Sequence, residues 1–139
     1  MKYPKTLAAM LLLCSSLIFG SCSPNFDYLS TTKEIISQGN WSVGYFYADT
    51  DKTNSFSEYS FRFNNGGILD CKRINDSCTG KWKVAKDIEG NEVINMELTT
   101  QDASLLQLNG NWKVTGKNIA NIALKTEGRG NGELKINKF

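Results

Sequence analysis

The chain has 139 residues, 16 Lys or Arg against 14 Asp or Glu, and no histidine, with a formal charge of +2 at pH 7. A charge this close to zero excludes the broad basic face with which proteins bind nucleic acid. The lack of histidine removes the commonest general acid or base and leaves no imidazole to complete a zinc site.

The first 21 residues have the pattern of a secretion signal. Lys2 and Lys5 give a positive start, and residues 7–20 form an apolar stretch too short for a permanent membrane-spanning helix. Removing residues 1–21 takes away both lysines, so 14 basic residues remain against 14 acidic ones. The exported chain is therefore expected to be formally neutral.

Residues 20–24, Gly-Ser-Cys-Ser-Pro, resemble the lipobox of bacterial lipoprotein precursors. In that family the signal is cut before the cysteine, which receives lipid. The resemblance implies lipidation of Cys22, a tether over residues 22–30 and attachment to the membrane through this N-terminal anchor. Because Ser23 is not the aspartate that retains some lipoproteins in the inner membrane, we expect an outer-membrane lipoprotein of the bacterial envelope, on its periplasmic or its surface face. The alternative is an ordinary secretory signal with Cys22 unmodified.

One domain is predicted over residues 31–139. Thr31 to Glu34 match a helix capping box and Gly39 suits a helix end, so a short helix is expected first. From Asn40 the apolar period changes from helical to two, which indicates strands. Eight strand segments follow, at residues 40–48, 57–63, 68–73, 78–86, 92–98, 111–115, 119–125 and 133–138, with a second short helix at 101–107. Sequential hairpins favour an all-β, eight-stranded antiparallel up-and-down barrel, since closure removes exposed edges.

A five-residue motif, Gly-x-Trp-x-Val, occurs at residues 39–43, 80–84 and 110–114, and each copy is expected to start a strand. Gly-x-Trp at the first strand, after a short helix, is similar to the lipocalin (calycin) signature. Together with the hairpin at 59–67, the three copies resemble the lipocalin-like domains of small Gram-negative lipoproteins. The resemblance implies a lipocalin-like barrel with tryptophans at its base, from the pairs Gly39 and Trp41, Gly80 and Trp82, and Gly110 and Trp112.

Cys71 and Cys78 are the two cysteines left after the signal and Cys22. They flank a turn expected at Asn75 and Asp76. If they face each other in a non-hydrogen-bonded pair, they form a disulfide staple across the hairpin, worth about 2 to 3 kcal/mol. Free thiols, or metal or redox chemistry, are the alternatives.

The predicted function depends on whether the interior of the barrel is filled by side chains or holds a ligand. If the tryptophan side of each strand faces inward, the interior holds Trp41, Val43, Tyr45, Tyr59, Phe61, Phe63, Trp82, Val84, Ile94, Met96, Leu98, Trp112, Val114, Ile122, Leu124, Leu134 and Ile136. An eight-stranded barrel is either filled by its own side chains or holds one small ligand. The first function is therefore a small apolar ligand in a pocket at the open end, lined by Tyr45, Tyr47, Phe61 and Met96. The second is a filled barrel that binds an unknown protein partner through its loops.

No enzymatic activity, metal or cofactor is expected. The strand pattern directs nearly every carboxylate outward, with Asp70 as the exception, and buried carboxylates are what acid–base catalysis would require here. Residues 49–54 lack the glycine at the sixth position of a calcium loop, and the glutamate at the twelfth is also missing. The glycine-rich residues 128–132 precede a strand and offer no helix N-terminus to a phosphate.

Overall fold

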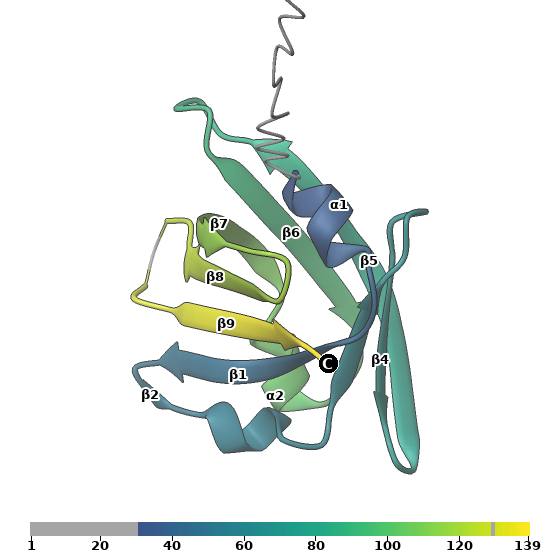
Figure 1. Ribbon diagram of the computed structural model, residues 1–139. Coiled ribbons are helices and arrows are strands. Elements are labelled where there is room, and N and C mark those ends of the chain that lie inside the picture. The colour runs from purple at the N-terminus through teal and green to yellow at the C-terminus, as the bar shows by residue number, and fades with distance from the viewer. Residues whose placement is uncertain (1–30, 129) are drawn as a thin grey trace, which may run out of the picture.

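The computed structural model describes residues 31–128 and 130–139 (Figure 1). The predicted signal (1–21) and the tether with Cys22 (22–30) lie outside these residues. Within the described residues the helical elements are α1 (Thr32–Ile36), the 3₁₀ helix η1 (Thr53–Phe56) and α2 (Ala103–Leu106). The strands are β1 (Trp41–Ala48), β2 (Thr50–Asp51), β3 (Ser60–Phe63), β4 (Ile68–Arg73), β5 (Asp76–Lys86), β6 (Glu92–Thr99), β7 (Gly110–Lys117), β8 (Asn121–Thr126) and β9 (Glu133–Lys138).

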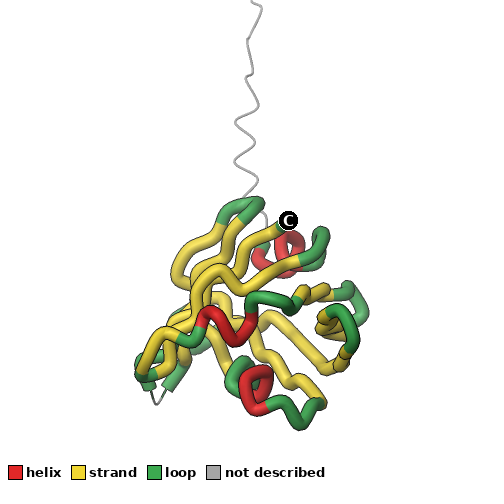
Figure 2. Tube along the Cα trace, turned by 90° about the horizontal axis from the view of Figure 1, so that it is seen from below, coloured by secondary structure: helices red, strands yellow, loops and turns green. Residues whose placement is uncertain are grey.

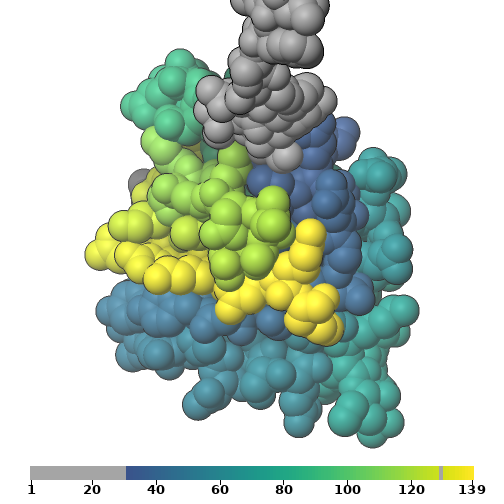
Figure 3. Space-filling model, in the orientation of Figure 1, coloured from purple at the N-terminus to yellow at the C-terminus, as the bar shows by residue number. Residues whose placement is uncertain are grey.

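The strands form a closed antiparallel barrel. Each of β3 to β8 pairs with the next strand along the chain, and β1 pairs with both β3 and β9. The first and last strands therefore lie side by side, as the blue and yellow surfaces of Figure 3 show. The two-residue β2 only extends the end of β1. The predicted all-β, up-and-down barrel of eight strands with a short helix before it is confirmed.

The helices α1 and α2 lie at opposite ends of the barrel (Figure 1). Successive strands alternate in direction, so β1 and β7 run antiparallel, and each of the two helices directly precedes one of them. In Figure 2, with helices in red, η1 and α2 contact each other, whereas α1 lies apart from both. We refer to the two ends of the barrel as the α1 end and the α2 end.

Side chains fill the interior. Trp41, Phe46, Phe56 and Trp112 are among the largest side chains that are almost completely buried. The Phe46 ring contacts that of Phe56 at a centroid distance of 4.9 Å and lies 6.1 Å from that of Trp112. Among the described residues, every buried side-chain nitrogen and oxygen has a hydrogen-bond partner. The barrel has the dense, satisfied core of a folded domain.

The inward face of β1 differs from the prediction at Tyr45. Val43 pairs with Ile136 and Tyr45 pairs with Lys135, so β1 has one extra residue, Gly44, between two successive partners on β9. Such a β-bulge changes which side chains face inward. Phe46 is therefore 1% exposed in the core, whereas Tyr45 is only partly buried. The other residues of the predicted inward set are buried or pack against the core.

One copy of the five-residue motif does not start a strand. β1 begins at Trp41 and β7 at Gly110, as expected, but β5 begins at Asp76. The tight turn at Ile74 and Asn75 lets β5 start early, so Trp82 lies in its middle. There β5 loses its pairing with β4, and the Trp82 amide donates to Gly67 O at 2.9 Å. The expected strand start is therefore wrong for residues 80–84.

Cys71 and Cys78 are direct partners in the β4–β5 ladder, but both are free thiols. The predicted disulfide is thus not present in the structure. Arg73 and Asp76 close the turn, so by the alternation of antiparallel pairs the cysteines, two pairs further on, form a hydrogen-bonded pair. In such a pair the side chains lie further apart than in the non-hydrogen-bonded pair on which the prediction depended.

Candidate functional site

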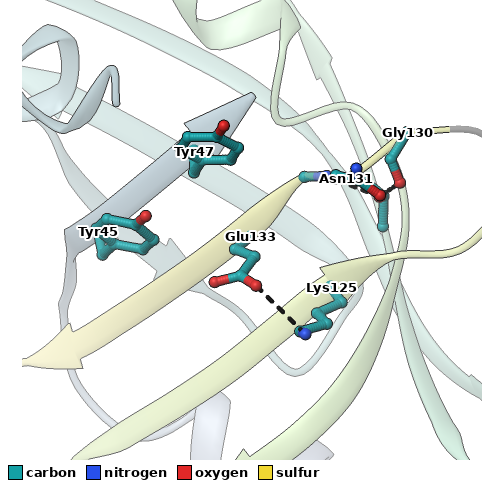
Figure 4. Close-up of a pocket in the computed structure, with 8 residues that line it drawn as sticks. Tyr45, Tyr47, Lys125, Gly130, Asn131 and Glu133 are labelled. Atoms are coloured by element: carbon teal, nitrogen blue, oxygen red, sulfur yellow. Dashed lines mark hydrogen bonds and ion pairs between the residues drawn. The ribbon is translucent and has the colours of Figure 1, made fainter. Parts of the chain in front are cut away.

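The outer wall of β1, β8 and β9 carries a hollow of about 620 Å³, which we call the tyrosine hollow (Figure 4). Four other hollows on the described surface are smaller, at about 260 to 450 Å³. The lining of the tyrosine hollow includes Tyr45 and Tyr47 of β1, Lys125 of β8, Glu133 of β9, and Gly130 and Asn131 of the turn between β8 and β9.

The β-bulge in β1 places both tyrosines on the outer wall. After Gly44, Tyr45 and Tyr47 share the outward face, and two residues of strand separate them by about 7 Å. Figure 4 shows both rings on the same side of the wall as Glu133 and Lys125. The register explains this row, since Tyr47 pairs with Glu133, which in turn pairs with Lys125.

Among the described residues that line the tyrosine hollow, the two charged side chains form an ion pair. Lys125 Nζ lies 3.3 Å from Glu133 Oε1, and Lys135 Nζ lies 5.5 Å from the centre of the Tyr45 ring. The second distance is that of a cation–π contact. Burial raises the pKa of Tyr45, and the nearby carboxylates of Glu133 and Asp51 raise it further. The phenol of Tyr45 is therefore a hydrogen-bond donor at neutral pH.

The turn between β8 and β9 forms one wall of the tyrosine hollow. Thr126 Oγ1 donates to Gly130 O at 2.9 Å and accepts from the Gly132 amide at 3.1 Å, which folds the turn back on the end of β8. A Cβ atom added at Gly130 would meet nothing within 4 Å. The backbone at Gly130 is thus open, whereas a Cβ atom added at Gly132 would meet Thr126 Cγ2 at 2.5 Å.

The structure does not bring the four predicted pocket residues together. Phe61 and Met96 are each 3% exposed in the core, and neither lines any of these five hollows. Tyr45 and Tyr47 lie on the outer wall instead. Sequence reasoning missed Lys125, Glu133 and Asn131, although the strand period does direct the first two outward.

The tryptophans of the three Gly-x-Trp motifs have structural contacts. The indole N–H groups of Trp41, Trp82 and Trp112 donate to Ile36 O at 2.8 Å, Asn64 O at 2.9 Å and Leu108 O at 2.8 Å. Trp41 starts β1 at the α1 end, and Trp82 contacts the β3–β4 turn at the same end. Trp112 lies at the α2 end, because β7 runs antiparallel to β1. The three side chains therefore do not share one base.

The other candidate residues make internal contacts. Asp70 accepts a hydrogen bond from Asn64 Nδ2 at 2.8 Å, and Asp51 accepts from the amide and hydroxyl of Thr53 at 2.9 and 2.7 Å. In the part of the chain that the structure describes, no group of three or more His, Cys, Asp or Glu side chains is placed to hold a metal ion. No helix of that part is long and apolar enough to cross a membrane.

The fold and the tyrosine hollow together define a filled, closed eight-stranded barrel with an aromatic site on its outer wall. No protein-family model matches the chain, and no curated protein does. The fold is similar to the crystal structure of a DUF4847 family protein from Bacteroides vulgatus, with a TM-score of 0.58 and 15% sequence identity. The match covers 77% of this chain and 96% of that one. At this identity the similarity shows the fold alone.

Proposed function

We propose that this protein is a non-enzymatic binding module, tethered to the bacterial outer membrane by lipid on Cys22, that binds its ligand in the tyrosine hollow. One observation carries the proposal: a β-bulge turns Tyr45 and Tyr47 outward into a hollow of about 620 Å³. Tyrosine is enriched at binding surfaces, since its large, stiff ring gives contact area at a small entropic cost.

The packed interior favours a filled barrel over a ligand held inside. Phe46, Phe56 and Trp112, each at most 2% exposed, occupy the end of the barrel where an open pocket was expected. Both functions predicted from the sequence, a ligand pocket inside the barrel and a filled barrel that binds through its loops, are therefore modified. The barrel becomes a rigid support, and its binding surface lies on the strand wall, beside the β8–β9 turn.

The position of the tyrosine hollow suits a tethered protein. Cys22 precedes Thr31, the cap of α1, by nine residues, so the anchor joins the barrel at the α1 end. Tyr47 lies six residues beyond Trp41 along β1, which is about 20 Å of strand. The tyrosine hollow is therefore near the α2 end, away from the point of attachment, where a ligand can reach it.

Internal hydrogen bonds support a role without catalysis. The pKa of Asp102 is lowered by the hydrogen bond from Tyr59 and by those from the backbone of α2. Burial would raise the pKa of Glu92, but hydrogen bonds from Lys117 and Thr32 outweigh it and lower the pKa. Both carboxylates are thus committed to holding the fold. The closed barrel, the helix before β1 and the buried Trp41 further support a lipocalin-like domain.

Chemical-shift mapping tests the site. We would prepare the ¹⁵N-labelled mature chain with Cys22→Ser and titrate it with an extract of the envelope of its host. The expected result is a set of shifts confined to the tyrosine hollow, at residues 45–47, 125–126 and 130–133, and lost in the double variant Tyr45→Ala/Tyr47→Ala. Phe139→Ala removes an aromatic side chain that is 70% exposed elsewhere, and it should keep the shifts. Shifts centred on Phe61 and Met96, or no shifts, would contradict the proposal.

Fractionation tests the anchor. Full-length protein made in its host should be recovered with the outer membrane, and Cys22→Ser should move it to the soluble fraction. Unchanged membrane recovery of Cys22→Ser would show that lipid on Cys22 is not what holds the protein there.

A further inference from the structure

We propose that the ligand of the tyrosine hollow is a neutral saccharide. This inference rests on the proposed function and names the ligand class for the same site. It follows from the aromatic rings, the polar groups, the paired charges and the paired strand edges around the tyrosine hollow.

The two rings form a surface suited to sugar rings. Tyr45 and Tyr47 lie two residues of strand apart on one face, so the backbone holds their Cα atoms about 7 Å apart. A pyranose ring presents C–H groups on one face and hydroxyls at its rim, and the C–H face packs on an aromatic ring. A saccharide of two or more units repeats that face, which matches two rings in a row (Figure 4).

Polar groups at the rim are free to bind hydroxyls. Among the residues drawn in Figure 4, no hydrogen bond involves the phenol hydroxyl of Tyr45 or Tyr47. The side-chain amide of Asn131 lines the same hollow. A phenol and an amide each donate and accept, as sugar hydroxyls do. A tyrosine phenol, with an ordinary pKa of about 10, is protonated at neutral pH and able to donate. The site thus has matching partners for a ligand rich in hydroxyl groups.

Among the described residues, the charged side chains at the tyrosine hollow already have partners, which favours a neutral ligand. Lys125 already faces Glu133 at 3.3 Å, and Lys135 lies over the Tyr45 ring at 5.5 Å. An anionic ligand would have to compete with Glu133 for Lys125, and a cationic one would have to displace a lysine. A neutral ligand leaves the Lys125–Glu133 ion pair in place and adds its own hydrogen bonds.

The strand pairing disfavours an extended peptide. A peptide commonly binds a sheet by adding a strand at a free edge. Along the tyrosine hollow, β1 pairs with β9 on one side and with β2 at Tyr47 on the other, and β9 also pairs with β8. A ligand must therefore bind the face of the strands through side chains, as a saccharide does.

An oligosaccharide array tests the inference. The probe is a panel of neutral and anionic oligosaccharides of defined structure, screened with the labelled mature chain carrying Cys22→Ser. We expect binding to neutral members, weakened by at least about tenfold in Tyr45→Ala/Tyr47→Ala, since two stacking rings are lost. Phe139→Ala, the aromatic control outside the tyrosine hollow, should bind as the parent does.

The outcomes separate the ligand class from the proposed function. Binding only to anionic members, or equal binding by the double variant, would overturn the saccharide inference. If no oligosaccharide binds but envelope extract still shifts the resonances of Tyr45, Tyr47 and Asn131, the ligand class is wrong while the binding site stands, and a protein partner becomes the next candidate. If neither probe binds, both proposals fail.

Discussion

The two ends of the barrel are closed by the same local unit with different polar contacts. At each end a short helix is followed by Gly-Asn-Trp, and the indole N–H donates back to a carbonyl four or five residues earlier. At the α1 end, Glu92 of the barrel wall accepts from the first residue of the helix, Thr32. At the α2 end, the cap of the helix, Asp102, accepts from Tyr59 at 2.7 Å. The short sequence motif determines the helix and the contact of the tryptophan. The polar contact of each helix depends instead on residues far away in the chain.

The largest expected effect tests whether the two units are equivalent. Trp41 is 0% exposed and Trp112 is 2% exposed, so Trp41→Ala and Trp112→Ala should each lower the free energy of unfolding by about 3 to 5 kcal/mol. Urea unfolding followed by circular dichroism measures this. Ile88→Ala, at a fully exposed position, should stay within about 0.5 kcal/mol of the parent. If one of the two substitutions lowered the free energy of unfolding only slightly while the other had the full effect, the two units would not be equivalent.

A second prediction concerns acid and the α1 end. Glu92 Oε2 accepts from Thr32 Oγ1 at 2.6 Å and from Lys117 Nζ at 2.5 Å, so Glu92→Gln should cost about 1 to 3 kcal/mol at pH 7. Folding lowers the pKa of Glu92, so the ionised carboxylate stabilises the fold at pH values above the ordinary carboxyl pKa of about 4.3. This stabilisation is lost as the pH falls below that value. The free energies of unfolding of the parent and of Glu92→Gln, measured from pH 7 to pH 3, should therefore converge as the pH falls.

The matched control for Glu92 is Glu58→Gln, since Glu58 is exposed and makes no ion pair within the described residues. Its unfolding free energy should follow that of the parent across the same pH range. A difference between Glu92→Gln and the parent that persists unchanged at pH 3 would show that the charge of Glu92 is not what holds α1.

A third, smaller effect tests the α2 end in alkali. Tyr59→Phe removes the hydrogen bond to Asp102 and should cost about 1 kcal/mol. Burial, with help from Asp102, raises the pKa of Tyr59 to about 12. The hydrogen bond from Tyr59 to Asp102 therefore stabilises the fold below the ordinary tyrosine pKa of about 10, and this stabilisation is lost as the pH rises through 12. An ultraviolet titration should show one tyrosine ionising near pH 12 that is missing in Tyr59→Phe, whereas Tyr47→Phe should keep it.

The smallest effect concerns the thiols near the α2 end. Burial raises the pKa of Cys71 and also that of Cys78, so both are protonated and poorly nucleophilic at pH 8. In the mature chain with Cys22→Ser, Ellman's reagent should react slowly in the native state and should detect two thiols per chain in guanidinium chloride without reductant. No thiols under the second condition would show a disulfide and contradict the structure.

The fold could be predicted because its signals are local. Hairpin turns such as residues 64–67, the two-residue period of the strands and the capping box at Thr31 each depend on a few neighbouring residues. The β-bulge in β1 was harder to predict from the sequence. Phe46 interrupts the alternation of β1, but that fact alone does not tell which of Tyr45 and Phe46 faces inward.

The tyrosine hollow could not be predicted, because it depends on pairings across the sheet. Tyr47 and Glu133 are 86 positions apart in the chain and meet only because β1 pairs with β9. The contact of Glu92 with Thr32 likewise joins residues 60 positions apart. Such partners follow from strand register, which sequence periodicity does not specify.

The pairing of β1 with β9 has a consequence for the timing of folding. β1 is among the first elements of the domain to be synthesised, and its main partner, Glu133–Lys138, is the last. The barrel cannot close until the final residues have left the ribosome, and long-range pairings of this kind form slowly. Until then the chain has an open edge at β1. The domain therefore reaches its closed form only after β9 has been synthesised.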